Sequence, residues 1–389
     1  MDVLYLSHCV PNPPDKGERI RAYHEVKRLA QRHRVHVACL ARSAAEKEAG
    51  MALADYCTSV RIEVLSAKPA LLRAAAQFAL GGCLMTSFYG NGALRRYVSE
   101  LAGRVRLGAS VIYSSAMAPY TPPGVPFVLD LVDVDSEKWL QYARTRFPGF
   151  AYRVEGQRLR VIEKDYARRS RRTFLATSQE LGLFRGFAPE APAECMENGV
   201  DFEFFDPERT PADTGAALTG RKFLAFVGVM DYFPNSDGVC WFASEVFAEL
   251  RRRDPALEFF IVGRNPSPAV ARLAKQDGIT VTGAVDDVRP YLAHARAVVA
   301  PLQIARGIQN KVLEALAMGK LVYASGAICQ TFQPALPAGV IPCATAAEFV
   351  ASISQSCPEA PVPDSGIREA ARTRYSWERN LDLLMRELS

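Results

Sequence analysis

The segment from Thr282 to Ser325 constrains the fold more than any other stretch of the chain. It contains an apolar run that ends at Pro301, a polar loop, an apolar pattern with helical spacing, and a second apolar run. Short apolar runs joined through a helical pattern are typical of buried parallel strands connected by a helix. The segment therefore predicts an α/β fold with an open parallel sheet.

The polar loop before that helix predicts a ligand site. In open parallel sheets, ligands bind beyond the carboxyl ends of the strands, and a helix N-terminus there favours anions. Lys311 and Glu314 are three residues apart, so they share one face of the first helical turn. An ammonium group suits a phosphate and a carboxylate suits ribose hydroxyls, which indicates a nucleotide diphosphate. The alternative is a solvated Lys–Glu pair on an ordinary helix.

Residues 301–322, PLQIARGIQNKVLEALAMGKLV, resemble the donor-site signature of the family-4 glycosyltransferases. These are retaining sugar-nucleotide enzymes of the GT-B fold, which has two doubly wound parallel-sheet domains with a cleft between them. By this resemblance, Glu314 matches the second glutamate of a Glu-x7-Glu motif, which holds the ribose. Arg306 stands at the position of the first glutamate, and this departure concerns how the donor sugar's hydroxyls are recognised.

The length of 389 residues exceeds that of most single-core domains, so we expect two domains. The run Asn198–Asp201 resembles the hinge-side segment of the family, and a polar stretch follows it. We therefore expect an N-terminal acceptor-side domain over residues 1–205 and a nucleotide-sugar-binding domain over 206–374. The resemblance implies that a C-terminal helix, at about 375–389, packs back on the first domain.

Composition and cysteine usage predict a cytoplasmic protein. Nine cysteines occur without a C-x-x-C pair, which favours reduced thiols over a disulfide framework. The N-terminus is typical of a strand and not of a secretion signal, and no apolar run reaches the roughly 18 residues that suggest a membrane span.

Basic residues are concentrated in residues 138–172, which carry 11 basic and 3 acidic side chains. One interpretation is a solvated basic helix. Another is peripheral contact with an anionic membrane, on the inner face of the cytoplasmic membrane. A nucleic acid partner is not expected. The apolar stretch at residues 71–89 is either core or a partly exposed surface that suits a lipid-linked acceptor.

The loops of the first half are expected to form the acceptor side. A proline-rich loop ends at Gly17, at the carboxyl end of the first strand, and related glycosyltransferases place a similar loop against the acceptor and the donor phosphates. Many relatives have a histidine near the end of the strand that here reads IYSS, and His8 is the nearest polar substitute. The acidic residues between 130 and 135 suggest a metal site only weakly, and no metal is expected. The acceptor-side candidates are His8, Lys16, Gly17, Ser115, Asp135 and Lys138.

The second half supplies the remaining donor-site candidates. Gly228 ends a strand, and the backbone amides after it could hold the diphosphate. Relatives carry an arginine and a lysine in this region, so Arg264 and Lys311 are the nearer cations here. The resemblance assigns the loop at residues 285–288 to the nucleotide base. The donor-binding candidates are Gly228, Arg264, Val285, Val288, Gly307, Ile308, Gln309 and Asn310, with Arg306, Lys311 and Glu314 as catalytic residues.

The predicted function is transfer of a sugar, with retention at the anomeric carbon, from a nucleotide diphosphate sugar to a glycan or polyprenyl-linked glycan acceptor. The resemblance is closest to bacterial sugar transferases of exopolysaccharide synthesis. No cofactor is expected, and catalysis would depend on orientation and on charge stabilisation at the leaving diphosphate. The alternatives are another GT-B enzyme, such as a sugar-nucleotide epimerase or a phosphorylase, and a non-catalytic GT-B module of an assembly complex.

Overall fold

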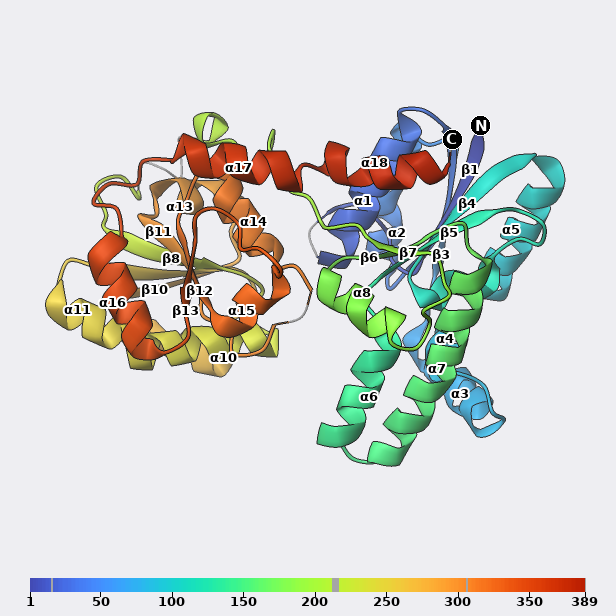
Figure 1. Cartoon of the computed structure of the whole chain (residues 1–389), viewed down its shortest axis with the longest axis horizontal. Helices are drawn as coiled ribbons and strands as arrows, with labels where there is room; N and C mark the ends of the chain where they lie inside the picture. Colours follow the sequence, from blue (N-terminus) through green and yellow to red (C-terminus); the bar gives the residue numbers. More distant parts are fainter. Residues whose placement is uncertain (15–16, 212–216, 306, 389) are drawn as a thin grey trace. The chain divides into compact units, whose positions relative to one another are not determined.

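The computed structural model shows two compact units, between which the chain passes twice. The N-terminal unit comprises Met1–Glu197 and Glu378–Ser389, and the C-terminal unit comprises Asn198–Trp377 (Figure 1). The residues that the structure describes are 1–14, 17–211, 217–305 and 307–388.

The N-terminal unit is built on a seven-stranded sheet with the order β3-β2-β1-β4-β5-β6-β7. All neighbouring strands are parallel. Every residue of the interior strand β1 is buried, as expected for a parallel strand covered on both faces. The strands are β1 (Asp2–Ser7), β2 (Arg34–Ala41), β3 (Ser59–Val64), β4 (Leu107–Tyr113), β5 (Phe127–Val132), β6 (Thr173–Leu175) and β7 (Ala193–Cys195). The helices are α1 (Gly17–Ala30), α2 (Ala44–Gly50), α3 (Ala67–Ala79), α4 (Leu84–Phe88), α5 (Gly92–Arg104), α6 (Asp135–Thr145), α7 (Gly149–Arg169), α8 (Ser178–Arg185) and α18 (Trp377–Glu387).

The C-terminal unit has a six-stranded parallel sheet with the order β10-β9-β8-β11-β12-β13. Helices cover both faces of this sheet (Figure 1). The strands are β8 (Phe223–Val227), β9 (Glu258–Val262), β10 (Ile279–Gly283), β11 (Ala297–Ala300), β12 (Val322–Ser325) and β13 (Val340–Cys343). The helices are α10 (Phe233–Phe242), α11 (Ala248–Arg253), α12 (Pro268–Leu273), α13 (Arg289–His294), α14 (Asn310–Ala317), α15 (Gly326–Thr331), α16 (Ala346–Ser356) and α17 (Ser365–Tyr375).

The strand order reverses between β8 and β11 in the C-terminal unit, and between β1 and β4 in the N-terminal unit. Such a reversal opens a crevice at the carboxyl ends of the two strands, because the connections that follow them leave toward opposite faces of the sheet. The predicted α/β fold with two doubly wound parallel sheets is confirmed. The segment from Thr282 to Ser325 supplies β11, α14 and β12, next to one of these crevices.

The hinge-side run Asn198–Asp201 lies in the C-terminal unit, whereas we expected the boundary after residue 205. Val200 forms a parallel bridge with Ser376, and its amide donates a hydrogen bond of 2.8 Å to the Tyr375 carbonyl. A side chain at Gly199 would come within 2.7 Å of Trp377, so the two segments are in close backbone contact. These contacts are made within the C-terminal unit, so the boundary between the units lies after Glu197.

Helix α18 belongs to the N-terminal unit by its contacts. Asp382 accepts a hydrogen bond of 2.6 Å from Arg28, and Glu387 accepts one of 3.0 Å from Arg172. Leu381 and Leu384 are buried. None of the helices that the described residues form has the length and apolar character needed to cross a bilayer.

Candidate functional site

Three loops meet at the carboxyl edge of the C-terminal sheet. The amide of Gly228, after β8, donates a hydrogen bond of 3.0 Å to the Val262 carbonyl, at the end of β9. The amide of Met230 donates one of 2.9 Å to the carbonyl of Arg264. The amide of Gly263 in turn donates one of 3.2 Å to Gly283, at the end of β10. The loops that carry the predicted donor residues Gly228 and Arg264 are therefore joined through their backbones.

Gly263 makes this contact possible. Its φ angle is +147°, and a Cβ atom there would lie 1.7 Å from the carbonyl oxygen of Gly228. Only a glycine can bring the two loops this close, because any side chain would overlap the neighbouring backbone.

Lys311 is held in the crevice between β8 and β11 by a residue that the sequence analysis did not single out. Its ammonium donates a hydrogen bond of 2.5 Å to Oδ1 of Asn235, on the first turn of α10. The buried Asn235 donates its own Nδ2 proton to the carbonyl of Val229, at 2.9 Å. The same ammonium lies 4.5 Å from the ring centroid of Phe226, on β8. Asn235 therefore links Lys311 to the loop after Gly228.

The pKa values of Lys311 and Glu314 are both shifted to about 7, one downward and the other upward. Burial lowers the pKa of Lys311 to about 7, although Glu314 raises it. Burial raises the pKa of Glu314 to about 7, although Lys311 lowers it. The Glu314 carboxylate accepts no hydrogen bond from the part of the chain that the structure describes. A bound ligand with an anionic group and hydroxyl donors would stabilise the charged forms of both residues.

Described residues at the start of α14 and just before it make local polar contacts. Asn310, the first residue of the helix, accepts a hydrogen bond of 3.2 Å from Asn198. Gly307 has a φ angle of +62°, which favours glycine, and its carbonyl accepts a hydrogen bond of 3.4 Å from Gln309. The side chain of Ile308 is buried in the core of the unit. The prediction for Arg306 falls outside the described residues.

The loop predicted to contact the base, at residues 285–288, is held by contacts of Arg289. Val285 and Val288 are half-buried against the core. Between them, Asp287 pairs with Arg289 at 2.6 Å, and Arg289 stacks on Phe204, with 4.0 Å between its guanidinium carbon and the ring centroid. Arg289 therefore ties this loop to the segment after the hinge.

On the N-terminal unit, His8 and Ser115 follow the adjacent strands β1 and β4. The imidazole of His8 stacks on Tyr113, with ring centroids 5.7 Å apart, and its Nε2 lies 3.6 Å from the Glu18 carboxylate. The interaction with His8 lowers the pKa of Glu18 to about 2. Gly17 begins α1 beside them. Lys16 lies outside the described residues.

Asp135 and Lys138, on the first turn of α6, form a polar cluster with Ser115. The hydroxyl of Ser115 donates a hydrogen bond of 3.0 Å to Asp135. The ammonium of Lys138 lies 2.9 Å from Asp133 and 3.3 Å from Asp135. Burial lowers the pKa of Lys138, but the two carboxylates outweigh burial and raise it overall.

The three aspartates between residues 130 and 135 do not converge. Asp130 is buried and pairs with Arg21 at 2.6 Å, whereas the other two pair with Lys138. In the described ranges, no group of three or more His, Cys, Asp or Glu side chains is placed to hold a metal ion.

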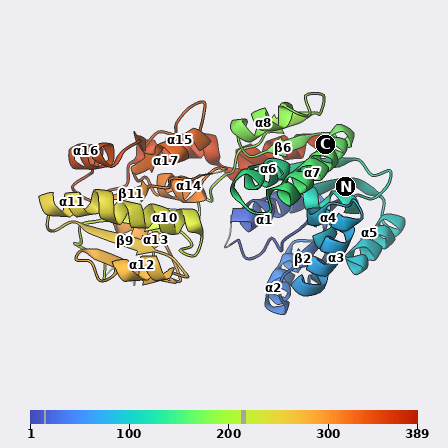
Figure 2. The ribbon, with the colours of Figure 1, turned by 90° about the horizontal axis from the view of Figure 1, so that it is seen from below.

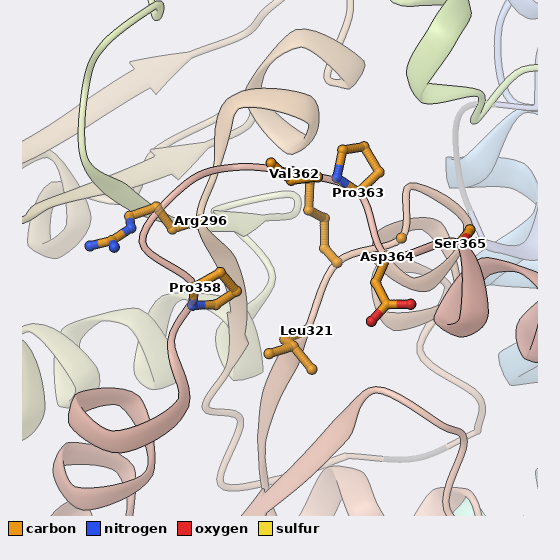
Figure 3. Close-up of a pocket in the computed structure, with 9 residues that line it drawn as sticks. Arg296, Leu321, Pro358, Val362, Pro363, Asp364 and Ser365 are labelled. Atoms are coloured by element: carbon orange, nitrogen blue, oxygen red, sulfur yellow. The ribbon is translucent and has the colours of Figure 1, made fainter.

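A separate cavity of about 380 Å³ lies at the opposite edge of the C-terminal sheet (Figure 3). It borders Arg296 and Leu321, which directly precede β11 and β12. Figure 3 shows the guanidinium of Arg296 pointing away from the other labelled side chains. None of the predicted donor residues lines this cavity. The cavity is lined by Arg296, Gly319, Lys320, Leu321, Pro358, Val362, Pro363, Asp364 and Ser365.

The strands and loops of the donor site lie within a region that matches a known protein family. Residues 221–357 match the sequence model of the family described as "Glycosyl transferases group 1". The C-terminal unit carries a group 1 glycosyltransferase domain. The prediction of a glycosyltransferase is confirmed at this level, and no curated protein sequence matches the chain.

Solved glycosyltransferase structures share the fold over the whole chain. Sucrose-phosphate synthase from Thermosynechococcus elongatus has a TM-score of 0.67 at 15% identity, covering 100% of this chain and 99% of that one. HepE from Anabaena, in complex with UDP, has a TM-score of 0.66 at 14% identity, with 100% and 99% covered. WaaG, a glycosyltransferase involved in lipopolysaccharide biosynthesis, has a TM-score of 0.62 at 14% identity, with 98% and 99% covered. At these identities the similarity shows the fold, which is GT-B.

Proposed function

We propose that the chain is a retaining, family-4-type glycosyltransferase that uses a nucleotide diphosphate sugar as its donor. The observation that carries the proposal is the Lys311 ammonium, which Asn235 holds beside the loop after Gly228 in the crevice of the glycosyltransferase domain. A cation, backbone amides and a helix N-terminus at one point suit a diphosphate. The structurally similar Anabaena HepE has been solved with UDP and with UDP-glucose, which supports this donor class.

In this proposal each donor residue has a defined role. Lys311 and the amides at the start of α14 stabilise the charge that develops on the leaving diphosphate. Glu314 accepts hydrogen bonds from the ribose hydroxyls, and the base lies against Val285 and Val288. The donor's own phosphate assists the incoming hydroxyl, so that the reaction needs no paired carboxylates, cofactor or metal. Catalysis then depends on orientation and electrostatic stabilisation.

We further propose that Arg306 sets the preference for the donor sugar. An arginine cannot accept hydrogen bonds from sugar hydroxyls as a glutamate does, but it pairs with a carboxylate in bidentate fashion. A uronic acid donor is therefore favoured over a neutral hexose. If Arg306→Glu transfers every accepted sugar as well as the wild type does, the residue does not recognise the donor sugar.

The proposed acceptor is a glycan or polyprenyl-linked glycan, used in the cytoplasm of a bacterium for exopolysaccharide or other cell-surface polysaccharide synthesis. The polar groups that follow β1, β4 and β5 at the carboxyl edge of the N-terminal sheet support a hydroxyl-rich acceptor. The involvement of WaaG in lipopolysaccharide biosynthesis supports a related role. The proposed acceptor residues are His8, Lys16, Gly17, Ser115, Asp135 and Lys138.

A thermal-shift panel of UDP, GDP, dTDP and ADP tests donor binding first. We expect one diphosphate to raise the melting temperature, because a ligand that binds only the folded state stabilises it. The matching radiolabelled nucleotide sugar is then incubated with and without glycan acceptors. Label transferred to an acceptor supports the proposal. An isomerised sugar without acceptor would indicate an epimerase, and binding without turnover on any acceptor would indicate a non-catalytic module.

A further inference from the structure

Helix α3 exposes an apolar face that its own unit does not cover. Of its 13 residues only two small ones, Ala70 and Ala74, are buried. Leu72 is 74% exposed, and Leu80, directly after the helix, is 81% exposed. A helix that buries only alanines gains little from packing, and a cluster of exposed leucines is the kind of apolar surface that often marks an interaction site.

The turn between α6 and α7 exposes two aromatic rings. Phe147 is 96% exposed and Phe150 is 71% exposed. Phenylalanine is among the most frequently buried residue types, so two rings in solvent within four residues are unusual for a surface turn.

Helix α7 connects these two apolar features, since it begins at the turn and its middle contacts the end of α3 and the start of α4. The guanidinium of Arg158, on α7, donates hydrogen bonds of 2.7 Å to the carbonyls of Phe78 and Gly82, at the end of α3. Glu155, one turn earlier on α7, accepts hydrogen bonds of 2.6 and 2.8 Å from the first two amides of α4. Helices α3, α4, α6 and α7 lie together in both views (Figures 1 and 2).

The two segments that carry these apolar side chains contain charges of one sign. Residues 67–83 and 141–154 contain five basic residues and no acidic residue. All five basic side chains are exposed. The guanidinium of Arg73 donates hydrogen bonds to the carbonyls of Ser87, Phe88 and Gly90, so it is not counted as available for a ligand. We call the remaining set the docking surface, and its members are Leu71, Leu72, Leu80, Phe147 and Phe150 with Lys68, Arg144, Arg146 and Arg153.

We propose that the docking surface binds an anionic lipid bilayer. Phe147 and Phe150 enter the boundary between headgroups and acyl chains, α3 lies with its leucines in the same layer, and the arginines contact headgroup phosphates. Arginine stems can lie along apolar surface while the charged ends stay in water, which allows both contacts at once. A nucleic acid would use the arginines but not the leucines and phenylalanines, and the absence of acidic residues matches a lipid surface.

Flotation with vesicles tests this inference independently of sugar transfer. We expect the wild type to float with vesicles of phosphatidylcholine and phosphatidylglycerol, and not with phosphatidylcholine alone. Phe147→Glu with Phe150→Glu should reduce this binding at least tenfold, since it replaces inserted rings with charges. Replacing Arg144, Arg146 and Arg153 together by Gln should reduce it about a hundredfold, from roughly 1 kcal/mol for each basic residue near an anionic surface.

Matched controls use comparable exposed residues in the C-terminal unit. Val362→Glu introduces one glutamate at an exposed apolar position, where the phenylalanine variant introduces two, and joint replacement of Arg252, Arg272 and Lys275 by Gln removes the same three charges as the arginine variant. Both controls should bind vesicles as the wild type does. In every variant the circular dichroism spectrum and the melting temperature should stay close to those of the wild type, which shows that the protein is folded.

Three results would overturn the inference. These are equal binding to both kinds of vesicle, no binding to either, and controls that lose as much binding as the docking-surface variants. Sedimentation gives a further check: self-association that Phe147→Glu abolishes, without lipid binding, would mean that a second copy of the chain covers the surface.

Discussion

The ammonium of Lys311 donates a hydrogen bond of 2.5 Å to Oδ1 of Asn235, and this bond joins the first turns of α14 and α10. The two helices follow β11 and β8, the neighbouring strands at which the order of the sheet reverses. The bond therefore crosses the crevice in which doubly wound sheets bind their ligands. Because an asparagine carries no charge, it orients the amine without forming an ion pair with it, so a phosphate can be the partner of its charged form.

Asn235→Ala should weaken binding of the active nucleoside diphosphate by about one to two decades, because a hydrogen bond to a charged group contributes roughly 1.5–3 kcal/mol. Affinity for the nucleoside alone should not change, because Asn235 acts through Lys311 on the phosphates. Isothermal titration calorimetry with both ligands measures the difference. Asn91→Ala, which removes the N-cap of α5 in the other unit, is the control for a general loss of stability. Equal losses for nucleoside and diphosphate would exclude this positioning role.

Glu314→Gln should weaken binding of the nucleoside itself by about one to two decades, since the lost interaction is a charge-assisted hydrogen bond to the ribose. Lys311→Ala should weaken binding of the nucleoside diphosphate and leave binding of the nucleoside unchanged. Calorimetric titration of each ligand into each variant separates the two residues. Unchanged nucleoside affinity in a folded Glu314→Gln protein would remove the central residue of the proposed site.

The affinity for a nucleotide sugar should be greatest near pH 7. Lys311 has a pKa of about 7 in the free protein, and a diphosphate raises it, so affinity falls as the pH rises above 7. Glu314 also has a pKa of about 7, and ribose hydroxyls favour its charged form, so affinity falls as the pH drops below 7.

The nucleotide sugar and its nucleoside, titrated from pH 5.5 to 9, separate the two effects. A nucleotide sugar suits this measurement because its diphosphate is a diester that does not titrate near neutral pH. The affinity for the nucleoside should fall only below pH 7. For the nucleotide sugar, Lys311→Ala should abolish the fall in affinity above pH 7. A flat profile for both ligands would mean that neither residue contacts them.

Gly263→Ala should lower the free energy of unfolding by about 2–4 kcal/mol and also reduce nucleotide affinity, because the new Cβ would overlap the carbonyl of Gly228. Gly220→Ala is the matched control, since Gly220 also has a positive φ, of +78°, but a Cβ there meets open space. The control should cost about 1–2 kcal/mol and leave affinity unchanged. Thermal unfolding and calorimetry measure both quantities. Similar effects of the two changes would show that backbone strain alone matters at Gly263.

The amino-acid sequence was sufficient to predict the two parallel sheets and the position of α14. Strands that are buried on both faces must be apolar along their whole length, and α14 shows the spacing of a helix with one apolar face. Both patterns are local, so they are visible without the tertiary structure. The position of Lys311 and Glu314 on one helical turn follows from the same periodicity.

The tertiary structure was needed to identify the groups that these residues meet. Asn235 is 76 positions from Lys311, and its sequence context resembles an ordinary helix start. Asp130 lies close in sequence to Asp135 but pairs with Arg21, on α1. The stretch at residues 71–89 could have been core or surface, and the structure exposes the leucines of α3. Hydrogen-bond partners and exposure depend on which strands become neighbours and which helix faces they cover, and long-range packing alone decides both.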